Sequence, residues 1–374
     1  MRSYGLILTA GFAMFSMFFG SGNLVFPLLI GVNNLSQYPS AILGFLITAV
    51  CVPFLGLLGM ISYQGDRQAY FSRLTKGGAF ILTFLMLALM GPFGVIPRCI
   101  TVAFGGVAVW HPTLTFWIFS LGFCLLTAAL IWKRNRIVSI IGLVLTPLKL
   151  GSILFLILFG LWYGHPINAT HHSSFDAFWS GISHGYQTMD LMAAFFFACT
   201  IYEYLYTHYL QKQQQQPHVR QLVRAGIQAS LLGASLLALV YIGFTALGAE
   251  YAPYLQATAP ESFLVEIAKQ ALGIYAVPFV AFTLAVSCLA TATVLTTLFV
   301  DFLQNEISGQ RLSRPQSIFL TLSMTFAMSL LGFQTICQGL GMVLEWIYPF
   351  LVAYALFQIV CKRKASTTVV RCSL

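Results

Sequence analysis

Two short polar segments interrupt long apolar stretches of this chain, and both carry groups that could bind small charged molecules. Residues 19–23 read Phe-Gly-Ser-Gly-Asn and lie between the apolar runs 6–18 and 24–30. Residues 183–190 read Ser-His-Gly-Tyr-Gln-Thr-Met-Asp and precede the apolar run 191–197. Glycines unwind a helix, and the backbone N–H and C=O groups that are freed then need other partners. Each segment could therefore bind a charged ligand.

The opposite polarity of two helix ends suits a molecule that carries both charges. A helix that starts near Asn23 would present the N–H groups of Ser21, Gly22 and Asn23 to a carboxylate. The helix that ends before it would present carbonyl groups to a cation. A substrate ammonium group would bind unwound carbonyl groups and the side chains of the second segment. We expect the substrate-binding residues to be Phe19, Gly20, Ser21, Gly22, Asn23, Gly185, Tyr186, Gln187, Thr188 and Asp190.

The composition places these segments in an all-α membrane protein. Hydrophobic residues make up 58% of the 374 residues and charged residues only 8%, whereas soluble domains carry about 25% charged residues. Apolar stretches of roughly 20 residues are typical of transmembrane helices. About ten blocks have this length: 5–32, 38–63, 79–108, 114–132, 137–163, 177–208, 222–249, 271–303, 315–333 and 337–360.

The positive charges predict the orientation of these blocks. Cytoplasmic loops retain lysine and arginine, so both termini are expected in the cytoplasm. The net charge of +9 then reflects topology and contact with the lipid bilayer, with no nucleic acid as partner. The cations of the even-numbered connections and the termini are Arg2, Arg67, Arg73, Lys76, Lys133, Arg134, Arg136, Lys212, Arg220, Arg224, Arg311, Arg314, Lys362, Arg363, Lys364 and Arg371.

The ten blocks divide into two sets of five within a single transporter domain, 1–374. These sets cover about 5–163 and 177–360, and residues 361–374 form a cytoplasmic tail. A repeat with an odd number of spans begins its second copy on the opposite side of the membrane. The two sets would then be inverted repeats, with the first and the sixth helix both broken. Paired broken helices indicate a transport site near the middle of the membrane.

Three motifs, in order, resemble the branched-chain amino acid:cation symporters. Residues 18–27 resemble that family's first-helix signature. Gly91-Pro92-Phe93 with Ile96-Pro97-Arg98 is similar to its third-helix motif, and residues 185–190 to its sixth-helix motif. The resemblance implies a LeuT-type fold of five plus five helices and inward transport of leucine, isoleucine and valine with an ion gradient. Family members usually have about twelve helices, so lacking two is expected to affect oligomer contacts more than the site.

The residues expected to bind the coupling ion depart from the family's pattern. The resemblance implies adjacent threonines in the eighth helix, where this chain has Ala290-Thr291-Ala292-Thr293. Lys149 lies near the middle of the fifth helix, where an ionisable group indicates function. We hypothesise that its ammonium group replaces sodium and that protons drive transport; the alternative is a structural pair with Asp190. The candidate coupling-ion residues are Ser16, Phe19, Ser287, Thr291, Thr293 and Lys149, with sodium possible at Ser16, Phe19 and Thr291.

Arg98 and Glu345 form a second pair of candidate charges. Counted from the helix ends at 1.5 Å per residue, both lie roughly 12–15 Å below the external surface. A charge at that depth needs a partner or water. The pair could be an outer gate that closes over the substrate, or a static ion pair.

The predicted function is a secondary active symporter in the inner membrane of a bacterial cell, working by alternating access. No chemistry on the substrate is expected, and no cofactor other than the coupling ion, Na⁺ or H⁺. The eight cysteines are scattered singly and indicate no metal site. Two alternatives stay open: a carrier for other aliphatic or sulfur-containing amino acids, and a membrane receptor that binds an amino acid without moving it. The oligomeric state is not predicted.

Overall fold

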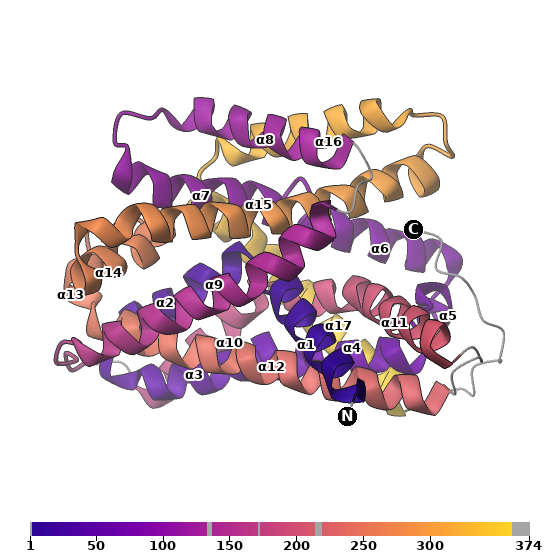
Figure 1. Cartoon of the computed structure of the whole chain (residues 1–374), viewed down its shortest axis with the longest axis horizontal. Coiled ribbons are helices and arrows are strands. Elements are labelled where there is room, and N and C mark those ends of the chain that lie inside the picture. The colour runs from indigo at the N-terminus through magenta and orange to yellow at the C-terminus, as the bar shows by residue number, and fades with distance from the viewer. Residues whose placement is uncertain (1, 133–136, 171–172, 214–218, 361–374) are drawn as a thin grey trace.

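The computed structural model describes residues 2–132, 137–170, 173–213 and 219–360, and this part of the chain is helical, with no strand (Figure 1). The predicted tail 361–374 lies outside it. The first half contains α1 Arg2–Phe18, α2 Ser21–Asn34, η1 Leu35–Gln37, α3 Tyr38–Leu46, η2 Ile47–Cys51, α4 Val52–Ser62, α5 Arg67–Phe71, α6 Lys76–Met90, α7 Val95–Trp110, α8 Phe116–Trp132 and α9 Ile137–Trp162. The second half contains α10 Ser174–Tyr186, α11 Asp190–Gln213, α12 Val219–Glu250, α13 Ala252–Leu255, η3 Pro260–Ser262, α14 Phe263–Leu272, η4 Ile274–Ala276, α15 Val277–Phe302, η5 Leu303–Ile307, α16 Arg314–Ser329 and α17 Phe333–Val360.

Both predicted helix breaks are confirmed. The first apolar block is two helices, α1 and α2, separated by Phe19 and Gly20. The sixth is also two helices, α10 and α11, separated by residues 187–189. Met189 in this second break has a φ of 60°, a left-handed conformation that few side chains adopt. The chain therefore turns sharply just before α11 begins.

A third break, between α6 and α7, was not predicted. The block 79–108 was expected to be one helix, but residues 91–94 form turns. Pro92 cannot donate a backbone hydrogen bond, and the Phe93 N–H reaches back five residues to the Ala88 carbonyl. Gly94 is required here because a Cβ atom would lie 2.0 Å from the Leu89 carbonyl oxygen. The break sets the direction of α7, which carries Arg98.

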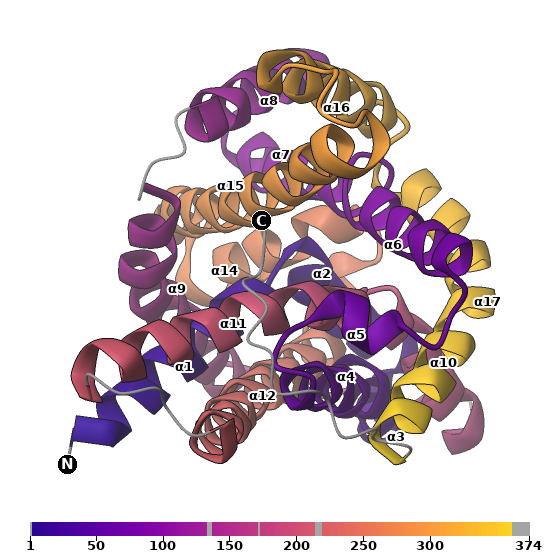
Figure 2. The same cartoon turned by 90° about the vertical axis from the view of Figure 1, so that its right-hand side faces the viewer.

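The helices pack in a pattern that exchanges partners between the two halves of the chain. α1 and α2 pack against α12, and α10 and α11 pack against α3 and α4. α7 runs beside α15, and α8 beside α16, in a separate layer (Figures 1 and 2). Inverted repeats pack in this way, because the first helix of each half meets the second helix of the other.

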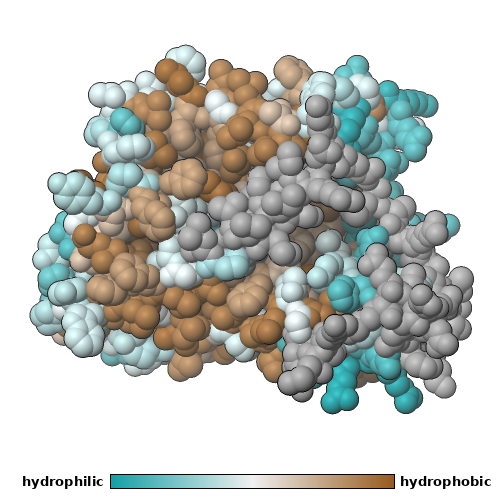
Figure 3. All heavy atoms as spheres, viewed as in Figure 1, coloured by the Kyte–Doolittle hydropathy of each residue, from teal (hydrophilic) through white to brown (hydrophobic). Residues whose placement is uncertain are grey.

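The outer surface of the molecule is apolar around its middle. In Figure 3, hydrophobic residues form broad areas in the upper and lower parts of the visible face, and polar residues gather towards the ends of the long axis. Large side chains such as Ile81, Leu125, Phe319 and Trp346 are exposed. Five helical segments in the described part are long and apolar enough to cross a membrane. These features are those of a multi-pass membrane protein.

Candidate substrate and ion site

The two breaks that the sequence predicts lie against each other. A Cβ atom on Gly22 would be 3.4 Å from the Thr188 Cα atom, so the first turn of α2 touches the second break. The Asn23 side chain crosses the gap and donates a hydrogen bond from Nδ2 to Asp190 Oδ2 over 2.7 Å. Asn23 and Asp190, which are 167 residues apart in the chain, thus join two half-helices at the centre of the protein.

A tyrosine of α12 completes this contact. The Tyr241 hydroxyl accepts a hydrogen bond from Asn23 Nδ2 and donates one to Asp190 Oδ2 over 3.3 Å. All three side chains are buried. Tyr241 was not predicted as a site residue, because nothing in its sequence context sets it apart from the other tyrosines among the 16 in the chain. We call Asn23, Asp190 and Tyr241 the central network.

The start of α2 provides the predicted anion-binding end. Gly20 precedes the helix, and its N–H contacts Asn23 Oδ1 at 3.3 Å. The first N–H groups of any α-helix have no acceptor within the helix; here that of Ser21 faces the Cys99 thiol, a weak acceptor that a carboxylate would replace. The Ser21 hydroxyl is buried and has no hydrogen-bond partner among the described residues. An anion at this end would meet several donors and the positive end of the helix dipole.

The residues of the second break have different structural roles. Gly185 allows helix packing, since a Cβ atom there would lie 1.9 Å from the Thr48 hydroxyl. The Thr188 hydroxyl bonds to the Gly185 carbonyl over 2.9 Å. The Tyr186 ring packs at a tilt against the ring of Tyr348, with centroids 4.8 Å apart and an angle of 38° between the ring planes. These contacts stabilise the conformation of the break. The carbonyl group of Gln187, which follows Tyr186 in the chain, contacts a charged side chain.

That charged side chain is Arg98, whose partner differs from the predicted one. The Arg98 guanidinium is completely buried, and its Nη1 atom donates to the Gln187 carbonyl over 2.8 Å. Glu345 is exposed on α17, and within the described ranges the only ion pairs are Lys269–Glu266 and Arg314–Asp301. The predicted Arg98–Glu345 pair is therefore not formed in this structure. Counting residues gave both groups similar depths, but α17 turns Glu345 outwards.

Lys149 lies at the first break, on the carbonyl end of α1. Its Nζ atom donates to the Phe19 carbonyl over 2.8 Å and sits 4.6 Å from the centroid of the Phe19 ring. The alternative pair with Asp190 is not formed, because no described residue makes an ion pair with that carboxylate. The ammonium group thus occupies the position where carbonyl groups were expected to hold a cation.

The structure places some of the other candidate ion ligands at the first break and others apart from it. A Cβ atom on Gly20 would lie 3.2 Å from the Thr291 methyl group, so Thr291 is at the break. Ser287 is buried, and its hydroxyl has no partner in the described part of the chain. The Thr293 hydroxyl bonds to the Leu289 carbonyl of its own helix and is directed away. Ser16, which was expected to act through its carbonyl group, lies in the last turn of α1 and is partly buried.

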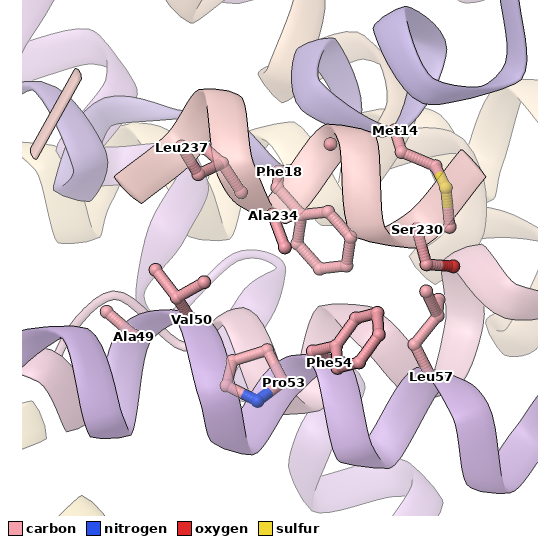
Figure 4. Close-up of a pocket in the computed structure, with 11 residues that line it drawn as sticks. Met14, Phe18, Ala49, Val50, Pro53, Phe54, Leu57, Ser230, Ala234 and Leu237 are labelled. Carbon is pink, nitrogen blue, oxygen red and sulfur yellow. The ribbon is translucent and has the colours of Figure 1, made fainter. Parts of the chain in front are cut away.

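Two cavities lie beside the breaks. One is lined by Lys149 and Ser287 together with apolar residues of α2, α9, α14 and α15. The other lies between α1, α4 and α12 and is lined by side chains such as Met14, Phe18 and Leu237 (Figure 4). The one hydroxyl of this second cavity, on Ser230, already bonds to the Gly226 carbonyl. An apolar cavity of this kind offers nothing to bind a zwitterion, which leaves the breaks themselves as the polar site.

Comparisons with known proteins agree with this geometry. A family model described as branched-chain amino acid transport protein matches residues 4–373. The chain is 30% identical to the branched-chain amino acid transport system 3 carrier protein of Pseudomonas aeruginosa, over 92% of this chain and 78% of that protein. It is 28% identical to a protein of Staphylococcus haemolyticus described as a branched-chain amino acid carrier, over 92% of this chain and 80% of the other.

Two solved structures share the fold. MhsT in complex with L-phenylalanine aligns with a TM-score of 0.58 at 15% identity and covers 96% of this chain and 89% of MhsT. The inward-facing conformation of Mhp1 aligns with a TM-score of 0.63 at 11% identity, covering 96% of this chain and 78% of Mhp1. Both are transporters with the LeuT-type fold. The chain therefore belongs to the branched-chain amino acid transport protein family and has the LeuT-type fold of a multi-pass membrane transporter.

Proposed function

We propose that this protein is a proton-coupled symporter that imports leucine, isoleucine and valine. It lies in the bacterial inner membrane with both termini in the cytoplasm, works by alternating access, performs no chemistry on its substrate and needs no cofactor. The family membership and the names of the relatives support the substrate class. The paired breaks at the centre of the fold support a binding site that opens alternately to each side.

The coupling ion is inferred from one contact, the hydrogen bond from Lys149 Nζ to the Phe19 carbonyl. An ammonium group presents positive charge and N–H donors to the carbonyl end of α1. It thereby neutralises the partial negative charge of this helix end, as a bound sodium ion would. Lysine can do this only while protonated. Loss of the proton would remove the charge and weaken the link between α9 and α1, so that the end of α1 becomes free to move.

The surroundings of Lys149 support a mobile proton. Its side chain is buried, and the neighbouring cavity includes the unpartnered Ser287 hydroxyl. No carboxylate of the described residues pairs with the Lys149 ammonium group, so its proton is not held by an ion pair. The same cavity reaches Leu264 of α14, which the predicted topology places on the external side. A proton would then reach Lys149 from outside.

The test is uptake of labelled leucine into proteoliposomes under separately imposed proton and sodium gradients. We expect an inward proton gradient to drive accumulation and a sodium gradient to have no effect. Lys149→Leu removes the ammonium group and should abolish the response to the proton gradient while exchange of leucine across the membrane continues. Ser235→Ala on the exposed face of α12 is the control, because its hydroxyl bonds to the Leu231 carbonyl of its own helix and does not line the cavity beside Lys149.

Sodium coupling is the second candidate, and the position of Thr291 beside Gly20 is the observation that favours it. It would appear in the same assay as accumulation that requires sodium and is indifferent to a proton uncoupler. That result would refute proton coupling, but it would still agree with the proposal that the protein transports branched-chain amino acids. If no gradient drove uptake of any branched-chain amino acid, although the protein bound it, the protein would be a receptor.

A further inference from the structure

Arg98 carries an unused pair of hydrogen-bond donors at the centre of the protein. Its side chain is 0% exposed and is the largest of the fully buried side chains. Nη1 donates to the Gln187 carbonyl over 2.8 Å, whereas Nε and Nη2 have no hydrogen-bond partner within the described residues. A buried donor without a partner is unfavourable by about 1–3 kcal/mol, and by more when it is charged. Such a group in a native fold needs a partner, which a ligand, an ion or a water molecule can supply.

No side chain neutralises this guanidinium. The buried charged side chains of the described part are Arg98, Lys149 and Asp190. Asp190 is near enough to interact electrostatically with Arg98, but it makes no ion pair and its Oδ2 atom is bonded to Asn23 and Tyr241. The Cys337 thiol lies beside the guanidinium, and a thiol is only a weak acceptor. A full positive charge thus remains available inside the protein.

The position of Arg98 is beside the anion-binding end of α2. The next residue, Cys99, contacts Ser21 at the first turn of α2. The guanidinium itself lies over the ring of Phe26, one turn further along, with 5.5 Å from Cζ to the ring centroid. The hydrogen bond to Gln187 fixes its other side to the second break. Arg98 therefore stands where α2, α7 and the second break meet.

We propose that Nε and Nη2 of Arg98 bind the α-carboxylate of the amino-acid substrate, together with the first N–H groups of α2. Nε and Nη2 lie on one edge of the planar guanidinium, and their parallel N–H bonds match the two oxygen atoms of a carboxylate. The substrate ammonium then faces Asp190, whose charge Arg98 leaves unpaired. This inference rests on the proposed function and assigns to Arg98 a binding role in place of a gate.

The test measures which end of the substrate Arg98 recognises. Purified protein binds radiolabelled L-leucine in competition with L-leucinol, which keeps the ammonium group and the side chain but has no carboxylate. We expect the wild type to prefer leucine by about 100-fold, since two hydrogen bonds to charged groups are lost with leucinol. In Arg98→Gln this preference should fall to a few-fold, because leucine binding weakens while leucinol binding is unchanged.

Arg98→Lys keeps the charge but loses the paired donors, and its preference should be intermediate, about tenfold. Lys269→Gln removes a cation from a half-exposed external position and should leave the preference unchanged. A readout without any variant uses the wild type alone: 4-methylpentanoate, a carboxylate without an ammonium group, should displace leucine better than 3-methylbutylamine does.

Two results would overturn the assignment. One is a preference for leucine over leucinol that persists in both Arg98 variants. The other is stronger competition by 3-methylbutylamine than by 4-methylpentanoate in the wild type, which would show that the ammonium group is the main anchor. If the wild type bound no branched-chain amino acid at all, the proposed function itself would fail, and that outcome is distinct because it needs no Arg98 variant.

Discussion

Tyr241→Phe removes one hydroxyl group from the central network and changes nothing else in side-chain shape. The hydroxyl is buried, accepts a hydrogen bond from Asn23 and donates one to Asp190 over 3.3 Å. These contacts connect α12 to the first turns of α2 and α11, which are the two half-helices that frame the site. We predict that the substitution weakens leucine binding, because the breaks are no longer fixed in their relative positions.

The size of the effect follows from the contacts. A hydrogen bond to a charged group contributes about 1.5–3 kcal/mol. The 3.3 Å distance between Tyr241 Oη and Asp190 Oδ2 is longer than is usual for two oxygen atoms, so the lower value applies. About 1.4 kcal/mol corresponds to a tenfold change in an equilibrium constant. The dissociation constant for leucine should therefore rise by about tenfold.

Equilibrium binding of labelled leucine to purified protein measures this change. Tyr251→Phe is the matched control: Tyr251 is also buried, and its hydroxyl donates to the Gly160 carbonyl over 3.0 Å, away from the breaks. The control should lower thermal stability but leave leucine affinity unchanged. Binding within twofold of the wild type by Tyr241→Phe, or an equal loss in both variants, would refute the positioning role of the central network.

Two further predictions concern acidic residues. Glu345→Gln should leave the transport rate within twofold of the wild type, because Glu345 is exposed and does not pair with Arg98. A large fall in uptake would instead support the hypothesis that Arg98 and Glu345 form an outer gate. Burial raises the pKa of the Glu261 carboxyl, in the short segment between α13 and α14, above its usual value of 4.5. The folded protein then favours the protonated form of this carboxyl more than the unfolded chain does. The free energy of unfolding of the wild type therefore falls as the pH rises above 4.5. Glu261→Gln should therefore raise the unfolding temperature at neutral pH, with a difference that shrinks towards pH 4, and a difference that is independent of pH would contradict this reasoning.

The sequence predicted the elements of the fold well because hydrophobic length and glycine content act locally. The breaks at residues 19–20 and 187–189 fall within the predicted segments 19–23 and 183–190, which residue type and the expected inverted repeat indicated together. The contact of Lys149 with the Phe19 carbonyl agrees with the hypothesis that its ammonium group takes the place of sodium, and not with the alternative pair with Asp190. The break at Gly91-Pro92-Phe93-Gly94 could have been predicted on the same grounds, since proline and two glycines disfavour a helix.

The remaining parts of the site depend on which face of a helix carries a residue. Counting residues from a helix end gives depth in the membrane but no rotation about the helix axis. Arg98 and Glu345 are at similar depths, yet one points into the protein and the other out of it. Tyr241 reaches Asn23 across 218 positions of the chain. Contacts of this kind arise from how helices pack, and composition and spacing do not specify them.

The two cationic side chains at the breaks share one property: each bonds to a main-chain oxygen. Lys149 uses the carbonyl of Phe19, and Arg98 uses that of Gln187. Every amino acid supplies a carbonyl group, so replacing the Phe19 or Gln187 side chain leaves both acceptors in place. Alanine at Gln187 would therefore leave the Arg98 contact in place, and alanine at Phe19 would remove the ring beneath Lys149 but not the carbonyl group that it bonds to. Only a change to the backbone itself, such as an ester in place of the amide, would reveal these partners.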